Sequence, residues 1–184
     1  MGIVARLRVR GAHTSTALTL AMAVLALTGC AGAGESGPAA VAAPFSAGGV
    51  AVSVRVESGD SGLRVLADLR PERPGFHLYS LALPDGGVDG IGIPTRIRAG
   101  GALRPTGPAT TDAQERVLRP AGLDVRLPVY RDGRITLELP VRRVGGADAD
   151  RARVVLTYGA CSEREGCLLP VRDRAVPLKL QPAG

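Results

Sequence analysis

A strict alternation of apolar and polar side chains begins at Val50 and limits the fold more than any other feature of this sequence. Valines occupy every second position from Val50 to Val56, and small, polar or charged residues stand between them. Successive side chains of a β-strand point to opposite faces, so this pattern predicts a strand with one buried face. Further runs of strand-forming residues follow at short intervals: 63–69, 77–83, 95–98, 123–130, 134–141, 153–158 and 175–180.

The segments between these runs hold residues that favour turns, such as PDGG at 84–87 and RDG at 131–133. The best candidate for a helix is 111–118, one or two turns long and ended by Pro120. Eight short strands within about 135 residues predict an all-β fold, a single β-sandwich domain.

The N-terminal segment differs from everything that follows. Basic residues from Arg6 to Arg10 precede an apolar run over 17–27, and the sequence LTGC follows at 27–30. This order of regions is typical of a secretory signal peptide. The LTGC ending resembles the bacterial lipobox, in which the cysteine becomes the lipidated N-terminus; the alternative is an ordinary signal peptide with a chance cysteine.

We therefore expect a protein in three parts. They are a lipoprotein signal peptide over 1–29, a flexible Gly/Ala/Pro tether over 30–47 that begins with lipidated Cys30, and a β-sandwich domain over 48–182. The lipid would hold the chain at the outer face of the cell membrane.

The net charge of +6 is weak evidence for nucleic-acid binding once the leader is set apart. Arg6, Arg8 and Arg10 precede the first acidic residue, and without them 20 of the 23 basic residues remain against 17 acidic ones, a net charge of +3. We expect no nucleic-acid partner.

Metal and cofactor chemistry has little support in the sequence. Both methionines lie in the leader, which excludes a thioether copper site in the domain. A zinc site would need Cys161, Cys167, His77 and a carboxylate to converge without the paired ligand spacing of zinc motifs. We expect neither metal nor cofactor.

Cys161 and Cys167 enclose a polar loop of five residues between apolar segments. Facing residues at the neck of a hairpin lie about 4.5–5.5 Å apart, within reach of a disulfide. One interpretation is a structural staple, although so short a loop would stabilise the fold by only about 2.4 kcal/mol. The other is a redox-active pair, since Glu163, Arg164 and Glu165 would leave the loop open to solvent and to exchange chemistry. The residues alone leave both interpretations open.

The cysteines belong to a longer pattern. YGAC at 158–161 is followed by Cys167, Pro170 and VPL at 176–178. Two earlier stretches precede it, GFHLY at 75–79 with GIGIPTR at 90–96, and VYRDG at 129–133 with LPV at 139–141. Together these segments resemble the N-terminal periplasmic domain of the DsbD family of thiol:disulfide interchange proteins, over residues 48–182.

The resemblance implies an immunoglobulin-like β-sandwich with one reactive disulfide in a cysteine-bearing hairpin. In that family the domain takes electrons from a thioredoxin-like protein, which is fed by a membrane electron carrier of the DsbD or CcdA type. It passes them to oxidised extracytoplasmic proteins, cytochrome c maturation being one setting for such transfer.

The resemblance also implies roles for individual residues. Cys167 would form the mixed disulfides with partners, and Cys161 would resolve them. Tyr79 matches a family tyrosine whose hydroxyl could steady the pair; a half-buried strand position is the alternative. His77 stands where the family often has an aromatic, and we favour a packing or surface position over a part in proton movement.

The sequence also departs from the family. The stretch that corresponds to its cap loop, 112–119, holds no aromatic to cover the sulfurs, so either Val117 or Leu118 takes that place or the pair is unshielded. A single proline, Pro170, follows the second cysteine, where a pair is frequent. The chain has neither the membrane domain nor the thioredoxin-like domain, so electrons are expected to come from separate proteins.

The sequence therefore predicts a monomeric, lipid-anchored extracytoplasmic protein that carries reducing equivalents on the Cys161–Cys167 pair, as a component of a protein-disulfide reductase system. The alternative is a non-catalytic β-sandwich lipoprotein with a structural disulfide, which acts as a binding module.

Overall fold

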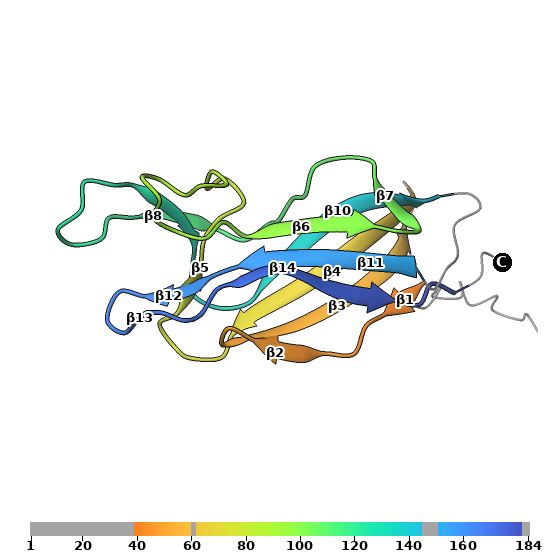
Figure 1. Ribbon diagram of the computed structural model, residues 1–184, viewed down its shortest axis with the longest axis horizontal. Helices are drawn as coiled ribbons and strands as arrows, with labels where there is room; N and C mark the ends of the chain where they lie inside the picture. Colours follow the sequence, from red (N-terminus) through yellow and green to blue (C-terminus); the bar gives the residue numbers. More distant parts are fainter. Residues whose placement is uncertain (1–38, 60–61, 145–150, 182–184) are drawn as a thin grey trace, which may run out of the picture. The chain divides into compact units, whose positions relative to one another are not determined.

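The computed structural model describes residues 39–59, 62–144 and 151–181 of the chain. Every regular element in this part of the chain is a β-strand, so the predicted all-β class is confirmed (Figure 1). The strands are β1 (Ala40–Val41), β2 (Phe45–Ala47), β3 (Val50–Gly59), β4 (Gly62–Pro71), β5 (His77–Leu78), β6 (Arg96–Gly100), β7 (Leu103–Pro105), β8 (Glu115–Leu118), β9 (Leu127–Tyr130), β10 (Ile135–Arg143), β11 (Ala152–Tyr158), β12 (Ala160–Ser162), β13 (Gly166–Cys167) and β14 (Val171–Leu178).

Two antiparallel sheets form what we call the sandwich body. The first has the order β1-β3-β4-β10-β7, with β2 also paired to β3, and the second has the order β14-β11-β6. The valines from Val50 to Val56 are at most 2% exposed, and the residues between them are of intermediate burial. The alternation in the sequence therefore sends one face of β3 into the core, as predicted.

The core of the sandwich body draws on both sheets. Val54 and Leu137 of the first sheet and Leu156 and Leu178 of the second belong to one hydrophobic cluster, and each is at most 1% exposed. Full burial of such a side chain contributes about 1.5–3 kcal/mol. The prediction of an immunoglobulin-like β-sandwich with a cysteine-bearing hairpin is confirmed as two packed antiparallel sheets and a hairpin that holds both cysteines.

Two smaller sheets, which we call the disulfide end, lie on the left of Figure 1. One has the order β13-β12-β5, and the other is the hairpin β8-β9. They are joined where Tyr79, just after β5, forms an antiparallel bridge with Val129 of β9. A second hydrophobic cluster packs here and includes Tyr79, Leu118, Leu127 and Cys161. Leu78 of β5, Tyr130 of β9 and Ala160 of β12 belong to the main cluster instead, so the two regions meet in one core.

The predicted helix over 111–118 is wrong. Residues 115–118 form β8, which pairs along its whole length with β9 and buries Leu118 to 6% exposure. The hydroxyl of Thr111 accepts a hydrogen bond from the amide of Ala113 at 3.2 Å, in a local turn rather than a helix cap. Pairing with β9 gives the backbone of this segment its hydrogen-bond partners, which a helix of one or two turns satisfies poorly.

The expected tether over 30–47 ends earlier than predicted, because residues 39–47 belong to the first sheet. Ala40 of β1 faces Val56, and Phe45 of β2 faces Val52. The backbones of β1 and β2 cover an edge that β3 would otherwise leave open, and small side chains such as Ala40, 3% exposed, pack into the core there. The predicted signal peptide and Cys30 lie outside the described residues.

The run over 77–83 is shorter as a strand than predicted. It turns after β5, where the amide of Leu83 donates to the carbonyl oxygen of Ser80 at 3.2 Å. This turn leaves Tyr79 beside the cysteine hairpin. Over the described ranges we find no helix with the length and hydropathy needed to cross a membrane.

Candidate functional site

The two cysteines form a disulfide at the neck of the β12–β13 hairpin. Cys161 pairs directly with Cys167 across the two strands, and their Cα atoms are 4.0 Å apart, slightly closer than the expected range. Gly166 adopts a positive φ of 79°, which allows the chain to return toward Cys167. The structure thus places both cysteines at the neck of a hairpin, as the sequence predicted.

The two sulfur-bearing residues differ in their exposure to solvent. Cys161 is 5% exposed, whereas Cys167 and the intervening residues 163–166 are exposed. The expectation of an accessible pair therefore holds for Cys167 and fails for Cys161. A thiolate approaching from solution meets the Cys167 side of the bond, and attack there would leave Cys161 as the departing group.

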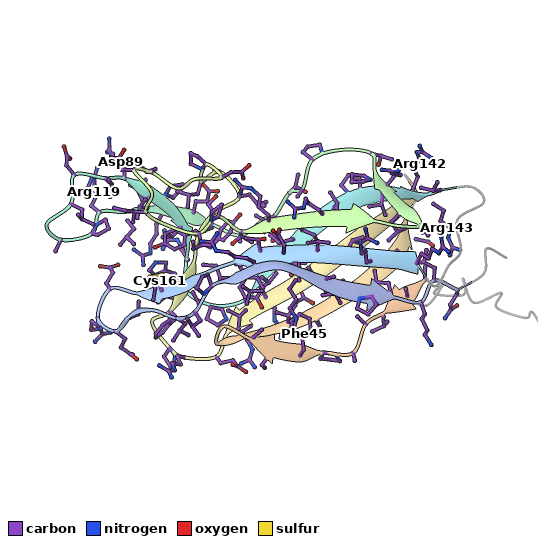
Figure 2. The ribbon with its side chains drawn as sticks, in the orientation of Figure 1. Phe45, Asp89, Arg119, Arg142, Arg143 and Cys161 are labelled. Atoms are coloured by element: carbon purple, nitrogen blue, oxygen red, sulfur yellow. A yellow bond between two sulfur atoms is a disulfide. The ribbon has the colours of Figure 1, made fainter. Side chains whose placement is uncertain are left out.

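Strand pairing places a histidine and a tyrosine beside the disulfide. His77 of β5 lies directly opposite Cys161, which in turn lies opposite Cys167, so the three residues form one row across the sheet. Side chains in such a row point to the same face. Tyr79 stands two positions after His77 and points to that same side. Figure 2 shows Cys161 in the region of β12, within the disulfide end.

Tyr79 contacts the buried sulfur directly. Its hydroxyl donates a hydrogen bond to Sγ of Cys161 at 3.4 Å, and the residue is 4% exposed. Burial raises the pKa of Tyr79, so the phenol keeps its proton and remains a donor at neutral pH. The structure thus brings Tyr79 to the pair and buries it more deeply than the half-buried strand position that was the alternative; its role in steadying the pair stays a prediction.

His77 is 1% exposed, in agreement with the expected packing position, but its ring carries two polar nitrogen atoms. Neither Nδ1 nor Nε2 has a hydrogen-bond partner among the described residues, and the ring stands edge-on to Tyr79 with centroids 5.9 Å apart. Burial lowers the pKa of His77, and the charge of Arg116 lowers it further. The imidazole is therefore neutral at neutral pH. A buried polar group without a hydrogen-bond partner costs about 1–3 kcal/mol. A position that served packing alone would avoid this cost with an apolar ring, so packing does not explain the histidine.

The disulfide forms one wall of a pocket of about 370 Å³. The facing wall is apolar and comes from Leu118, at the end of β8, and from the following loop as far as Leu123. Of the two residues proposed to replace the missing aromatic, Leu118 is the one that lines the pocket, while Val117 is 54% exposed. The wall extends beyond the predicted stretch 112–119.

Ion pairs link the cysteine loop to its neighbours. Nη1 of Arg116 on β8 lies 3.1 Å from Oε1 of Glu163, and Nη1 of Arg73 lies 3.5 Å from Oε2 of Glu165. Both pairs are partly exposed, so each contributes less than about 1 kcal/mol. Sequence reasoning missed them because the partners are distant in the chain and lie in a loop and a strand whose pairing was not known.

The disulfide, and not a metal ion, is the reactive group that the described residues offer. In the part of the chain that the structure describes, no group of three or more His, Cys, Asp and Glu side chains is arranged to hold a metal ion. The arrangement that is present offers an accessible sulfur, a buried sulfur with a hydrogen-bond donor, and a neutral imidazole.

Fold and site together define an all-β sandwich with a disulfide hairpin at one end. Among solved structures the chain is similar to the N-terminal domain of DsbD from Neisseria meningitidis in its reduced form, with a TM-score of 0.40 and 19% identity. The alignment covers 79% of this chain and 87% of that chain. No protein-family model matches the sequence. No curated protein matches it either.

Proposed function

We propose that this protein exchanges electrons with other proteins through the Cys161–Cys167 dithiol/disulfide pair. The observation that carries the proposal is the unequal burial of the two cysteines: Cys167 is exposed, while Cys161 is 5% exposed and accepts a hydrogen bond from Tyr79. A bond built in this way presents one sulfur for attack and stabilises the departing thiolate on the other. A staple has no need of either feature.

In the first half of the cycle the disulfide is reduced. A thiolate of the donor attacks Sγ of Cys167, the Cys161–Cys167 bond breaks, and its electron pair remains on Cys161. A second thiolate of the donor then attacks the donor sulfur that is bonded to Cys167, and the thiolate of Cys167 is released. The donor leaves as a disulfide, and this protein holds two thiols.

In the second half the electrons pass to an oxidised protein. The thiolate of Cys167 attacks the substrate disulfide, and one substrate sulfur leaves as a thiolate. Cys161 then attacks Sγ of Cys167, re-forms the original bond and displaces the second substrate sulfur. The substrate gains two electrons and two protons, and the disulfide of this protein is restored.

The surroundings suit this chemistry. Tyr79 donates its hydrogen bond to the sulfur that must carry the negative charge when the bond breaks. The apolar wall from Leu118 to Leu123 limits water around that sulfur, which strengthens the hydrogen bond.

The proposed cellular setting follows from the N-terminal sequence and the family resemblance. The LTGC motif supports lipidation at Cys30 and a place on the outer face of the cell membrane. The proposed donor is a thioredoxin-like protein, fed by a membrane electron carrier of the DsbD/CcdA type, and the proposed acceptors are oxidised extracytoplasmic proteins. The protein would act as a monomer.

The reduction potential of the pair tests the proposal first. We expect a value above about −250 mV after equilibration with glutathione or thioredoxin, in the range of exchange-active disulfides. A value below about −300 mV would mark a structural bond and favour the alternative, a non-catalytic binding module.

A trapping experiment tests which cysteine meets the partner. A thioredoxin that lacks its resolving cysteine is first activated as its mixed disulfide with thionitrobenzoate. In a Cys30→Ser background, the exposed Cys167 of the Cys161→Ser variant should attack the thioredoxin sulfur, release thionitrobenzoate and form a stable mixed disulfide. The matched control, Cys167→Ser, should trap far less because Cys161 is 5% exposed. Equal trapping by both variants would contradict the assigned roles.

A further inference from the structure

We propose that His77 is the proton acceptor for the thiol of Cys161 when Cys161 resolves a mixed disulfide. The inference rests on the proposed exchange function and adds to it the group that activates the buried cysteine. Reduced Cys161 must lose its proton to attack Cys167, and its burial makes loss of that proton to water slow and unfavourable.

The first support is the row of side chains across β5, β12 and β13. His77 lies directly opposite Cys161, on the side away from Cys167. Directly opposite residues of an antiparallel pair have Cβ atoms about 4.5–5.5 Å apart and point to one face. Both also line the same pocket. The imidazole is therefore the basic side chain that strand pairing places beside Cys161.

The second support is that both ring nitrogens are buried and lack hydrogen-bond partners among the residues that the structure describes. Buried polar atoms are nearly always paired, so each exception calls for an explanation. In the disulfide state Sγ of Cys161 carries no proton. Reduction converts it to a thiol, a hydrogen-bond donor, in the residue that strand pairing sets opposite His77. The thiol proton would give one of the two ring nitrogens a partner in the reduced half of the cycle.

The charges around His77 keep it in the form that can accept a proton. Arg116 of β8 lowers the pKa of His77, in the same direction as burial, while Asp132 after β9 and Glu163 in the cysteine loop raise it. Tyr79, two residues after His77 in the same segment, has a raised pKa and keeps its proton. The net pKa is below the ordinary value of 6.5, so the neutral ring predominates near pH 7.

The step balances as follows. The proton moves from Sγ of Cys161 to a ring nitrogen of His77, and the resulting thiolate attacks Sγ of Cys167. The Cys161–Cys167 bond forms, and the bond from Cys167 to the substrate sulfur breaks with its electron pair on the substrate. The imidazolium then gives its proton to that departing thiolate, so His77 ends neutral.

The aryl disulfide dithionitrobenzoate isolates this step, because each sulfur it loses appears as coloured thionitrobenzoate. Added to the fully reduced chain with Cys30→Ser, which leaves Cys161 and Cys167 as its two thiols, it reacts first at Cys167, and the second release reports the attack by Cys161. For the wild type we expect the rate of the second release to be level from about neutral pH upward and to fall at lower pH. Its midpoint should match the titration of His77 followed by NMR, a comparison that needs no substitution.

Two variants remove the acceptor. His77→Gln keeps a neutral polar side chain of similar size, and His77→Phe keeps a buried ring. In both we expect the second release at pH 7 to slow by about 10²-fold and to rise about tenfold per pH unit, with the first release changed little. Ile91→Leu is the packing control in the same pocket and should keep the wild-type profile.

The outcomes separate this inference from the proposed function. A wild-type midpoint that differs from the titration of His77, or His77 variants with the wild-type profile, overturns the proton-acceptor role even where thioredoxin is trapped on Cys167. Failure to trap thioredoxin, with the wild-type plateau present and lost in both variants, rejects the exchange partner and upholds the role of His77.

Discussion

The sandwich body and the disulfide end are built in different ways. The sandwich body holds the longest strands, with ten residues in each of β3 and β4, and its interior is almost wholly apolar. The disulfide end has strands of two to four residues and buries a histidine, a tyrosine and a cysteine. The sandwich body thus buries apolar side chains, as a stable core does, whereas the disulfide end also buries polar ones.

The difference indicates where stability and chemistry are located. Most of the buried apolar side chains belong to the main cluster, so the disulfide end can hold an unpartnered imidazole without unfolding the domain. Natural proteins depart from core rules mainly at functional sites. The predictions below test whether the two regions are as separate as this division requires.

The largest effect should come from the core of the sandwich body. Leu156 is fully buried in β11, and Leu156→Ala should lower the free energy of unfolding by about 2–5 kcal/mol, through lost burial and the cavity left behind. Guanidinium denaturation measures this loss. The reduction potential of the Cys161–Cys167 pair should change little, because Leu156 does not line the pocket that holds the disulfide.

The matched control is Leu123→Ala, in the pocket wall of the disulfide end. Leu123 is 48% exposed, so its truncation should change the free energy of unfolding by less than about 0.5 kcal/mol. A loss as large as that of Leu156→Ala would show that the pocket wall contributes to stability as much as the main core does, and the division would fail.

Reduction of the disulfide should have the next largest effect. The bond closes a loop of about seven residues, and its loss should destabilise the chain by about 2.4 kcal/mol in the chain-entropy model. Denaturation with and without a reductant gives the difference, and circular dichroism should show the sandwich body intact in both states. Unfolding on reduction would instead identify the bond as a staple for the whole domain.

Acid should reveal the buried imidazole. Because the pKa of His77 is below 6.5 in the folded chain, the unfolded chain takes up the proton first as pH falls. Stability is therefore full above about pH 6.5 and declines below it, by at most about 1.4 kcal/mol per pH unit for one proton. The lowered pKa values of Asp68 and Glu57 act in a more acidic window, below their ordinary values of 3.8 and 4.5.

Denaturation of the oxidised chain between pH 7.5 and 5 measures this decline. His77→Phe carries no titrating ring and should lose little stability over the same range. Parallel curves for the wild type and this variant would mean that His77 is not held neutral in the fold.

The sequence predicts the sandwich body better than the disulfide end, for a physical reason. A ten-residue alternation such as that of β3 determines its own buried face, because one register alone places every valine inside. The row from His77 to Cys167 depends instead on pairing between β5 and β12, more than 80 residues apart, which no local pattern encodes. The same holds for residues 111–118, whose polar sequence permits a short helix until β9 supplies a partner strand.

The smallest effect should come from the ion pair between Arg116 and Glu163, which joins β8 to the cysteine loop across the pocket. The side chains are 34% and 57% exposed, so a double-mutant cycle with Arg116→Ala and Glu163→Gln should give a coupling energy of about 0.2–1 kcal/mol that falls with added salt. The exchange chemistry should respond more clearly than the stability does. Arg116→Ala removes a charge that lowers the pKa of His77, so the acid limb of the resolving rate should move to higher pH, whereas Glu163→Gln should move it to lower pH. Shifts in the same direction for both variants would mean that the pair acts on the loop's position rather than on the charge of the ring.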